Sequence, residues 1–396
     1  MTTQAIDAGR PGERQDMVDG LRGYALLGLF LVHMCELFEL YWAVEVPPSV
    51  VHDTVFAIFA GKAYAIFALC FGFSVFAMMD GEARRGRDFT GRLAWRLGIL
   101  LVIGLLHGLI YRGEIIQILS VLGLSMLLIN RIRSLKALWA LAAFFFLQPW
   151  SLFRIAAALS GQEWAVSQPN FMHDPAMPIY LTGTFVQNVV ANLWDGQVMK
   201  WWFMFESGRM SQILGLFVLG LILGRTGFFA AEDRHARTRR IAIVAVLVAI
   251  FAARWLRNLP AETLFGADLG GAAWVWGMAS SAWVDLGWTI LSVLLFVEVW
   301  RLLKGRVIGW LAPAGRMTLT LYIAQSLVFV PVFYGYGLGG YATIGQTQAF
   351  VIGVIAFAIQ MAFAAWWFSR YRYGPLEWGL RSATWLRKVP MRKTAS

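Results

Sequence analysis

The first long apolar stretch of the sequence is interrupted by residues that can do acid–base chemistry. It reads DGLRGYALLGLFLVHMCELFELYW, residues 19–42, and contains Arg22, His33, Glu36 and Glu39. An α-helix rises by about 1.5 Å per residue, so Arg22 and His33, eleven residues apart, share one face about 16 Å apart. Glu36 follows one turn later. A neutral imidazole can take a proton from a hydroxyl or an amine, and a carboxylate can orient it, so the pattern indicates general base catalysis.

A second apolar stretch repeats this spacing. In RLGILLVIGLLHGLIYRGE, His107 follows Arg96 by eleven residues. If both helices run outward from the cytoplasm, His107 and His33 lie at similar depth. A tight turn then brings Glu114 close to His107, and Gln117 lies one turn into the next helix.

We therefore predict a polar pocket inside a helical bundle, because ionisable residues within membrane spans are usually functional. The predicted catalytic residues are His33, His107, Glu36 and Glu114. The predicted substrate- or donor-binding residues are Arg22, Arg96, Arg112, Gln117, Asp285, Tyr322 and Gln325.

Structural roles are the alternative for each of these residues. Arginines near the ends of spans snorkel to the interface, and a single histidine inside a membrane often hydrogen-bonds a neighbouring helix. His173 and Asp174 are adjacent, but no further ligand follows at a recognisable spacing, so we expect no metal site. The sequence contains no motif of a hydrolase or of a nucleoside triphosphatase.

The composition specifies the fold class. Of 396 residues, 59% are hydrophobic and 14% are charged, whereas soluble domains carry about 25% charged residues. We therefore expect an all-α, polytopic helical membrane protein in the lipid bilayer. The net charge of +11 is explained by basic cytoplasmic loops, and we expect no binding of nucleic acid. The two cysteines, Cys35 and Cys70, lie in apolar runs and are expected to be unpaired core residues.

The hydropathy pattern predicts ten spans with both termini in the cytoplasm, since every second connection is basic. We expect a polar N-terminal tail over 1–20, a single membrane domain over 21–370 and a basic C-terminal tail over 371–396. Residues 158–207 form a long connection on the opposite side. The predicted spans are 21–43, 54–79, 93–111, 114–130, 135–157, 208–229, 239–258, 273–300, 316–335 and 347–369.

Several segments resemble those of one bacterial family. DGLRGYALLGLFLVHM, GLLHGLIYRGEIIQILSVLGL, GRMTLTLYIAQSLVFVPVFYGYGL and SRYRYGPLEWGLRSATW occur in the order typical of YeiB-like membrane proteins, the domain of unknown function 418. The resemblance covers residues 16–390 and implies a bacterial inner-membrane protein related to the transmembrane acyltransferases.

The resemblance also implies roles for individual residues. Arg22 and His33 match the acyltransferase-3 signature of a basic residue followed, after ten residues, by histidine. Many YeiB-like relatives have asparagine at the position of His33. His107 with Gly113 and Glu114 matches a histidine and Gly-Asp feature in which glutamate here replaces aspartate.

Three functions are therefore open. The first is an acyltransferase that moves an acyl group from cytoplasmic acyl-CoA, such as acetyl-CoA, to a hydroxyl or amine of a sugar, lipid or small molecule, with no tightly bound cofactor. The second is a proton-coupled transporter that uses the same groups as a relay. The third is a non-catalytic membrane protein. The residues do not indicate an oligomeric state.

Overall fold

The chain folds into a bundle of helices, shown by a computed structural model that describes residues 11–230, 233–266 and 269–393. Residues 1–10 of the expected N-terminal tail lie outside these ranges. Within them the only strand-like feature is an isolated bridge between Tyr371 and Arg392. The all-helical prediction is confirmed.

Six helical segments of the described chain are long and apolar enough to cross a membrane. They are α1 (Pro11–Cys35) with η1 (Leu40–Trp42), α2 (Val50–Phe59) with α3 (Ala63–Ala83), α4 (Thr90–Gly108), α14 (Ala236–Asn258), α16 (Gly271–Leu302) and α19 (Gln346–Arg370). Three bent pairs raise the number to nine. They are α7 (Leu135–Phe146) with α8 (Pro149–Leu159), α12 (Asp195–Glu206) with α13 (Arg209–Arg225), and η3 (Gly309–Leu311) and α17 (Ala312–Arg316) with α18 (Thr318–Phe333).

The prediction of ten spans is therefore wrong by at least one. The predicted span at 114–130 is divided into α5 (Ile116–Gly123) and α6 (Met126–Ile129). Eight residues of helix are about 12 Å long, whereas the hydrocarbon core is about 30 Å thick. The turn after Gly123 is held by the Ser125 hydroxyl, which donates to the Leu122 carbonyl over 2.6 Å.

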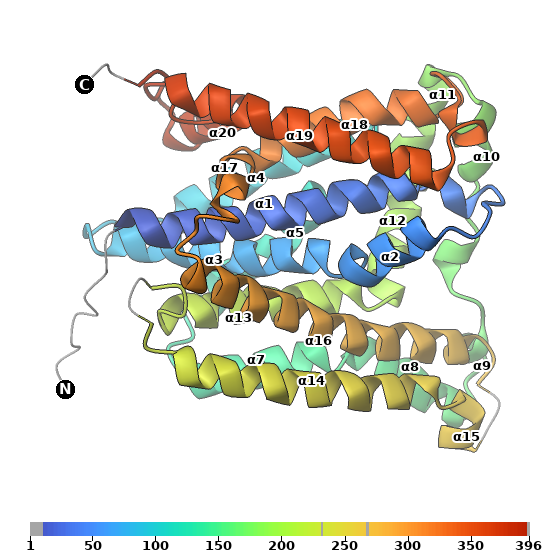
Figure 1. Cartoon of the computed structure of the whole chain (residues 1–396). Coiled ribbons are helices and arrows are strands. Elements are labelled where there is room, and N and C mark those ends of the chain that lie inside the picture. Colours follow the sequence, from blue (N-terminus) through green and yellow to red (C-terminus); the bar gives the residue numbers. More distant parts are fainter. Residues whose placement is uncertain (1–10, 231–232, 267–268, 394–396) are drawn as a thin grey trace.

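The bundle has two distinct ends (Figure 1). We call the end where α1 begins and where α20 (Pro375–Trp385) lies the terminal face. The opposite end, with α10 (Met177–Thr182) and α11 (Phe185–Leu193), is the distal face. The remaining short elements are α9 (Glu163–Val166), η2 (Asn170–Met172), α15 (Ala261–Phe265) and η4 (Gly340–Ala342).

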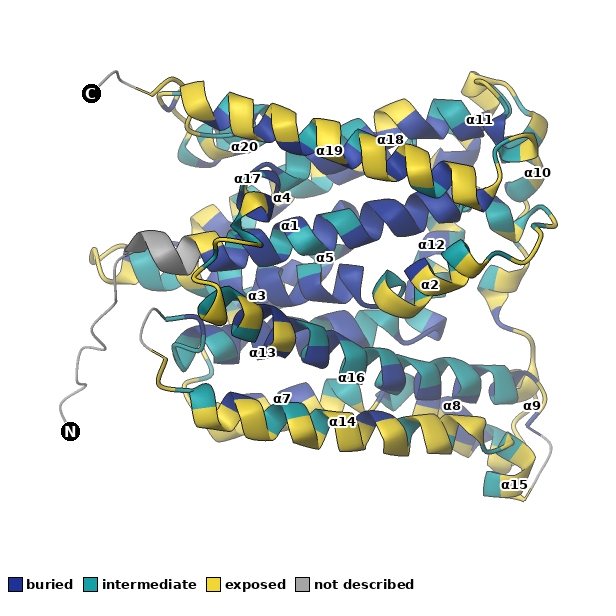
Figure 2. Ribbon diagram, in the orientation of Figure 1, coloured by how far each residue is buried: buried dark blue, intermediate teal, exposed yellow. Residues whose placement is uncertain are grey.

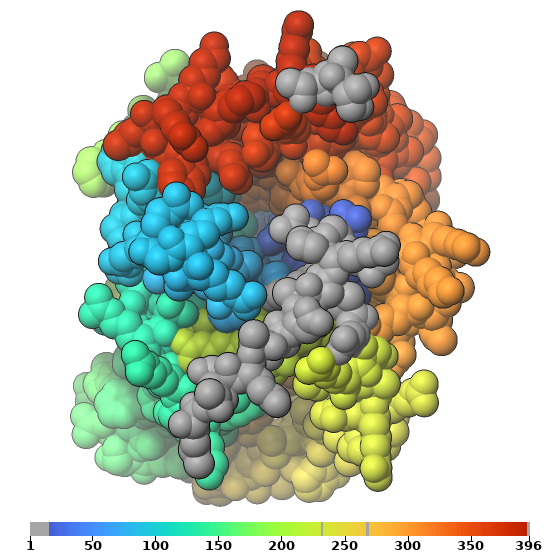
Figure 3. Space-filling model, turned by 90° about the vertical axis from the view of Figure 1, so that its left-hand side faces the viewer, coloured from blue at the N-terminus to red at the C-terminus, as the bar shows by residue number. Residues whose placement is uncertain are grey.

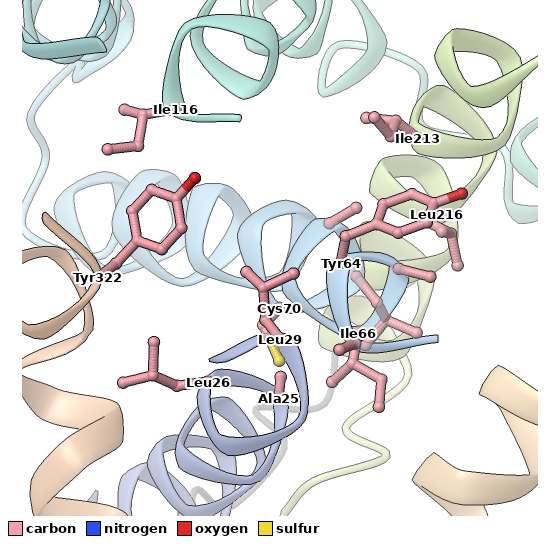
Figure 4. Close-up of a cluster of buried hydrophobic side chains, with 14 of the residues drawn as sticks. Ala25, Leu26, Leu29, Tyr64, Ile66, Cys70, Ile116, Ile213, Leu216 and Tyr322 are labelled. Atoms are coloured by element: carbon pink, nitrogen blue, oxygen red, sulfur yellow. The ribbon is translucent and has the colours of Figure 1, made fainter. Parts of the chain in front are cut away.

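The core lies around α1, α3 and α13, which are largely buried in Figure 2. Figure 4 shows Ala25, Leu26 and Leu29 of α1 beside Cys70 of α3 in this core. Both cysteines are buried and unpaired, as expected.

Helices α3 and α13 approach closely through glycines. A Cβ on Gly220 would lie 2.7 Å from the backbone nitrogen of Phe73, and one on Gly72 would contact the backbone of Phe217. Small residues allow this close helix packing in membranes, where dispersion between backbones replaces the hydrophobic effect as the driving force.

Gly220→Ala is therefore expected to destabilise the protein by about 1–3 kcal/mol, because the new methyl group meets backbone atoms that cannot rotate away. Gly98→Ala on α4 is the matched control, since a Cβ there meets nothing within 4 Å. Thermal unfolding in detergent measures both variants. Equal midpoints for the two would show that α3 and α13 can separate at no cost.

Helix α14 presents an apolar face to the outside of the bundle (Figure 2). Its other face packs against α16. Outward-facing side chains recur every three or four residues, which is one face of a helix, and each is at least 60% exposed: Ile241, Val244, Val248, Phe251 and Trp255. This stripe suits contact with lipid, in agreement with a multi-pass membrane protein.

Two of the broken spans meet at their breaks. Gln148 separates α7 from α8 with a φ of 60°, and Gly208 separates α12 from α13 with a φ of 74°. A Cβ on Gly208 would contact the side chain of Gln148. The backbone carbonyls freed at the break are satisfied by side chains: Ser211 Oγ donates to Phe145 O over 2.9 Å, and Trp283 Nε1 donates to Phe146 O over 2.8 Å. Such compensation is required where a helix is interrupted inside a membrane.

Candidate active site

Two histidines lie on either side of one tyrosine near the distal face. His33 is in the last turn of α1 and His107 is in the last turn of α4. The ring of Tyr111, which follows α4, lies 5.4 Å from the ring of His33 and 6.2 Å from that of His107. The structure thus brings together the two residues that the sequence analysis selected as bases.

Tyr111 connects the histidine of α1 to the end of α4. Its hydroxyl lies 3.0 Å from His33 Nδ1, and the tyrosine is fully buried. Burial and the nearby Glu39 carboxylate raise the pKa of Tyr111 well above its ordinary value. The hydroxyl therefore keeps its proton at neutral pH. Glu36 Oε2 lies 3.5 Å from the same ring nitrogen of His33.

The imidazole ring of His107 is buried. It is 4% exposed, and within the described residues neither ring nitrogen has a hydrogen-bond partner. Its Nδ1 lies 3.9 Å from Glu114 Oε1, and its ring packs edge-on against Tyr322 of α18 at 5.3 Å. Buried polar groups are usually satisfied, so an unsatisfied imidazole indicates a site for a ligand group or water.

Glu114 is fully buried and caps the start of α5. Its carboxylate accepts from the backbone nitrogen of Ile116 and, over 3.0 Å, from that of Gln117. The cap holds the carboxylate beside His107 because α4 and α5 approach closely: a Cβ on Gly104 would lie 2.6 Å from the nitrogen of Gln117.

Arg112 links three chain segments at the distal face. Its Nε lies 3.3 Å from Glu39 Oε2, and its Nη2 lies 2.8 Å from Asp174 Oδ2. Burial alone would lower the pKa of Arg112, but the two carboxylates outweigh it and raise the pKa. The guanidinium therefore connects Glu39, next to η1, with Asp174 in the segment before α10.

Lys200 of α12 is a member of the cluster that the sequence analysis missed. It is 5% exposed, and its Nζ donates to Gln117 Oε1 over 3.0 Å. In the sequence it stands beside Trp201 and Trp202, as an ordinary interfacial lysine would. Only the return of the long connection 158–207 across the bundle brings it to α5. Asp174 was missed for the same reason. Tyr111 follows His107 by four residues, about one helical turn, and this spacing could have identified it.

Lys200→Met is expected to lower the activity of the site about tenfold or more, because a hydrogen bond from a charged donor is typically worth about 1.5–3 kcal/mol. Methionine fills a similar volume, so the protein should remain folded. Turnover and thermal unfolding, measured on the same preparation, separate the two effects. Unchanged turnover would remove Lys200 from the site.

The other predicted residues lie in different places. Tyr322 belongs to the cluster, and its hydroxyl lies 3.5 Å from the carbonyl of Gly113. Gln325 donates instead to Gln360 of α19 over 2.8 Å. Asp285 of α16 forms an ion pair with Lys62 over 3.1 Å.

Two of the predicted substrate- or donor-binding arginines, Arg22 and Arg96, are near the terminal face. Arg22 pairs with Asp19 over 2.6 Å and donates to Ser74 of α3. Arg96 lies against α20, with its Nη1 3.4 Å from the hydroxyl of Thr384. Both are far along their helices from the histidines, eleven residues in each case.

Two bacterial proteins resemble the chain over almost its whole length. It is 25% identical over 410 residues to the uncharacterized protein YxaH of Bacillus subtilis (strain 168), with 96% of each chain covered. It is 24% identical over 401 residues to the uncharacterized protein YeiB of Escherichia coli (strain K12), covering 94% of this chain and 96% of that protein. Residues 223–387 match the family described as protein of unknown function DUF418.

A second match lies in the N-terminal part of the chain. Residues 14–175 match the catalytic domain of heparan-alpha-glucosaminide N-acetyltransferase. That range contains both histidines, Tyr111, Glu114 and Asp174. Tyr322, which packs on His107, comes from the DUF418 match. The cluster is therefore assembled from both matched regions.

Proposed function

We propose that this protein is a membrane acyltransferase. It moves an acyl group from acyl-CoA to a hydroxyl or amine of a sugar, lipid or small molecule at the histidine cluster of the bacterial inner membrane. The observation that carries the proposal is His107, an imidazole buried beside Glu114 with both ring nitrogens unpartnered among the described residues. The match of residues 14–175 to an N-acetyltransferase catalytic domain supports the reaction class.

His107 acts as the general base in this proposal. Its imidazole removes the proton of the acceptor as the acceptor oxygen or nitrogen attacks the thioester carbonyl carbon. The carbon–sulfur bond of the tetrahedral adduct then breaks, and CoA leaves as the thiol after taking the proton from the imidazolium. Glu114, whose Oε1 lies 3.9 Å from His107 Nδ1, orients the ring. Lys200 and Gln117 supply N–H donors for the negative charge on the carbonyl oxygen.

His33 and Glu36 position the site. The contact of 3.0 Å between His33 Nδ1 and the Tyr111 hydroxyl fixes the tyrosine between the two rings. Arg112 closes the distal side through its two carboxylate partners. The acceptor enters from the distal face, and the donor extends from the terminal face along α4.

The proposal is tested with purified protein in lipid nanodiscs and acetyl-CoA labelled in the acetyl group. A panel of aminosugars, sugar alcohols and lipid amines serves as acceptors, and release of free CoA is followed in parallel. We expect transfer of label to at least one acceptor class. Failure of the wild-type protein to bind CoA would exclude the acyltransferase.

Proton-coupled transport is the second candidate, and the three bent spans favour it. Interrupted helices at mid-membrane are typical of secondary transporters, whose substrates bind at the breaks. Proteoliposomes with an imposed pH gradient distinguish the two. Uptake of a solute without acyl-CoA would support transport, and acetyl transfer without a gradient would support the enzyme.

A further inference from the structure

A cavity of about 490 Å³ opens on the terminal face, at the junction of the α3–α4 loop and the end of α20. Its lining is basic and aromatic, with two acidic side chains: Glu82, Arg87, Asp88, Phe89, Arg92, Trp385 and Arg387. Figure 3 shows this end of the molecule, where the light-blue segment that includes the loop lies against the red C-terminal segment. None of these residues belongs to the histidine cluster.

Three guanidinium groups surround one indole ring. The Cζ atoms of Arg92, Arg387 and Arg87 lie 4.7, 5.9 and 6.0 Å from the centroid of Trp385. Like charges gathered at one place repel each other, and of the three arginines only Arg87 forms an ion pair with a carboxylate among the described residues.

Among the described residues, two of these arginines have no carboxylate partner. The Glu82 carboxylate forms ion pairs with Arg85 and Arg87 over 2.6 and 2.7 Å. Asp88 accepts from the backbone nitrogen of Thr90 over 2.9 Å. In the described part of the chain, no carboxylate forms an ion pair with Arg92 or Arg387. Their charges are therefore available to a ligand.

The backbone holds Arg387 over the cavity. Leu386 adopts a φ of 51°, in the left-handed region that a leucine rarely occupies. The turn is closed by the nitrogen of Arg387, which donates to the carbonyl of Ser382 over 3.1 Å. The reversal brings Arg387 back beside the ring of Trp385 instead of away from the bundle.

We propose that this cavity, the Trp385 pocket, binds the phosphorylated nucleotide end of the acyl-CoA donor. The inference rests on the proposed function for the identity of the ligand. Guanidinium groups bind phosphate oxygens with paired hydrogen bonds, and an indole ring stacks on a nucleobase. CoA offers both features, with a pyrophosphate and a 3′-phosphate attached to an adenosine.

The position of the pocket fits a ligand that reaches the histidines. Arg92 and Arg96 are one turn apart on α4 and both face α20, at Trp385 and Thr384. His107 is fifteen residues beyond Arg92 on the same helix, which is a rise of about 22 Å. A donor whose phosphates and reactive carbonyl are joined by a long flexible chain bridges such a distance. Arg96 lies on the way and supplies a further positive charge.

The test compares CoA with 3′-dephospho-CoA on the full-length protein in phosphatidylcholine nanodiscs. For the variant Arg92→Gln/Arg387→Gln we expect CoA affinity at least tenfold weaker than that of the wild type. Lys304→Gln/Arg306→Gln is the matched control, because these exposed residues are on the terminal face but do not line the pocket. Removal of the 3′-phosphate should weaken binding to the wild type and to the control, with little further loss in the pocket variant.

The outcomes separate the pocket from the function. If CoA binds the wild type and the pocket variant equally, the pocket inference is overturned and the acyltransferase stands. If the wild type does not bind CoA, both are overturned. A lipid headgroup offers the same phosphate chemistry, so the measurement is repeated in discs with phosphatidylglycerol. Loss of the CoA signal there, with no difference left between wild type and pocket variant, would assign the pocket to lipid and overturn the inference.

Discussion

Replacing His107 with alanine is expected to reduce acetyl transfer by about 10²–10⁴-fold, the range in which general bases contribute. The protein should stay folded, because no hydrogen bond to either ring nitrogen exists among the described residues and none is broken. The initial rate of label transfer and the thermal unfolding midpoint are measured together. A variant that unfolds early and retains its specific activity would assign His107 a structural role.

His235→Ala is the matched control for that experiment. His235 precedes α14, and its Nε2 lies 3.1 Å from the carbonyl of Thr226, away from the cluster. The control should keep wild-type turnover. The transfer rate of His33→Ala should lie between the rates of His107→Ala and His235→Ala, because this change removes the hydrogen-bond partner of Tyr111 and leaves the base in place.

Arg112→Ala is expected to have the largest effect on stability, about 3–5 kcal/mol. The change leaves the carboxylates of Glu39 and Asp174 near each other without their shared cation, and the Asp174 side chain is only 6% exposed. Because burial of an unpaired charge is the cause, Asp174→Asn in the same chain should recover part of the loss. Thermal unfolding in detergent gives the comparison.

The control for Arg112 is an exposed pair of similar geometry. Arg84 and Asp80 lie 2.9 Å apart one turn along α3, with the Arg84 side chain 58% exposed. Such surface pairs contribute at most a few tenths of a kcal/mol. Arg84→Ala should therefore leave the unfolding midpoint almost unchanged. Equal effects of the two variants would show that water reaches the distal pair freely.

Local periodicity was enough to select the residues of α1 and α4. Helix geometry fixes the separation of Arg22 from His33 and that of Arg96 from His107, because a helix repeats the same rise and turn whatever surrounds it. Glu114 follows His107 within a few residues, so a single turn of the chain was enough to predict that the two side chains lie close together.

Contacts between distant segments could not be predicted in this way. Lys200 and Asp174 reach the cluster from the long connection, whose course over the distal face has no periodic signal. Asp285 was expected to join the histidines, but it pairs with Lys62 at the junction of α2 and α3.

The count of spans failed for a related reason. A hydropathy window reports that a segment is apolar, and it does not distinguish a segment that faces lipid from one that other helices cover. The residues of α5 and α6 are apolar because α4, α3 and α13 pack against them. Two short helices separated by a turn therefore look like one span in the sequence.

The meeting of the two breaks at Gln148 and Gly208 has a mechanical consequence. Because each break is filled by the other, α8 and α12 cannot tilt independently about their own bends. The two breaks share one contact, between Gln148 and Gly208. The backbone carbonyls at the end of α7 accept hydrogen bonds from Ser211 and Trp283. Since α12 carries Lys200, we expect a displacement of α8 to change the position of the Lys200 ammonium group beside Gln117.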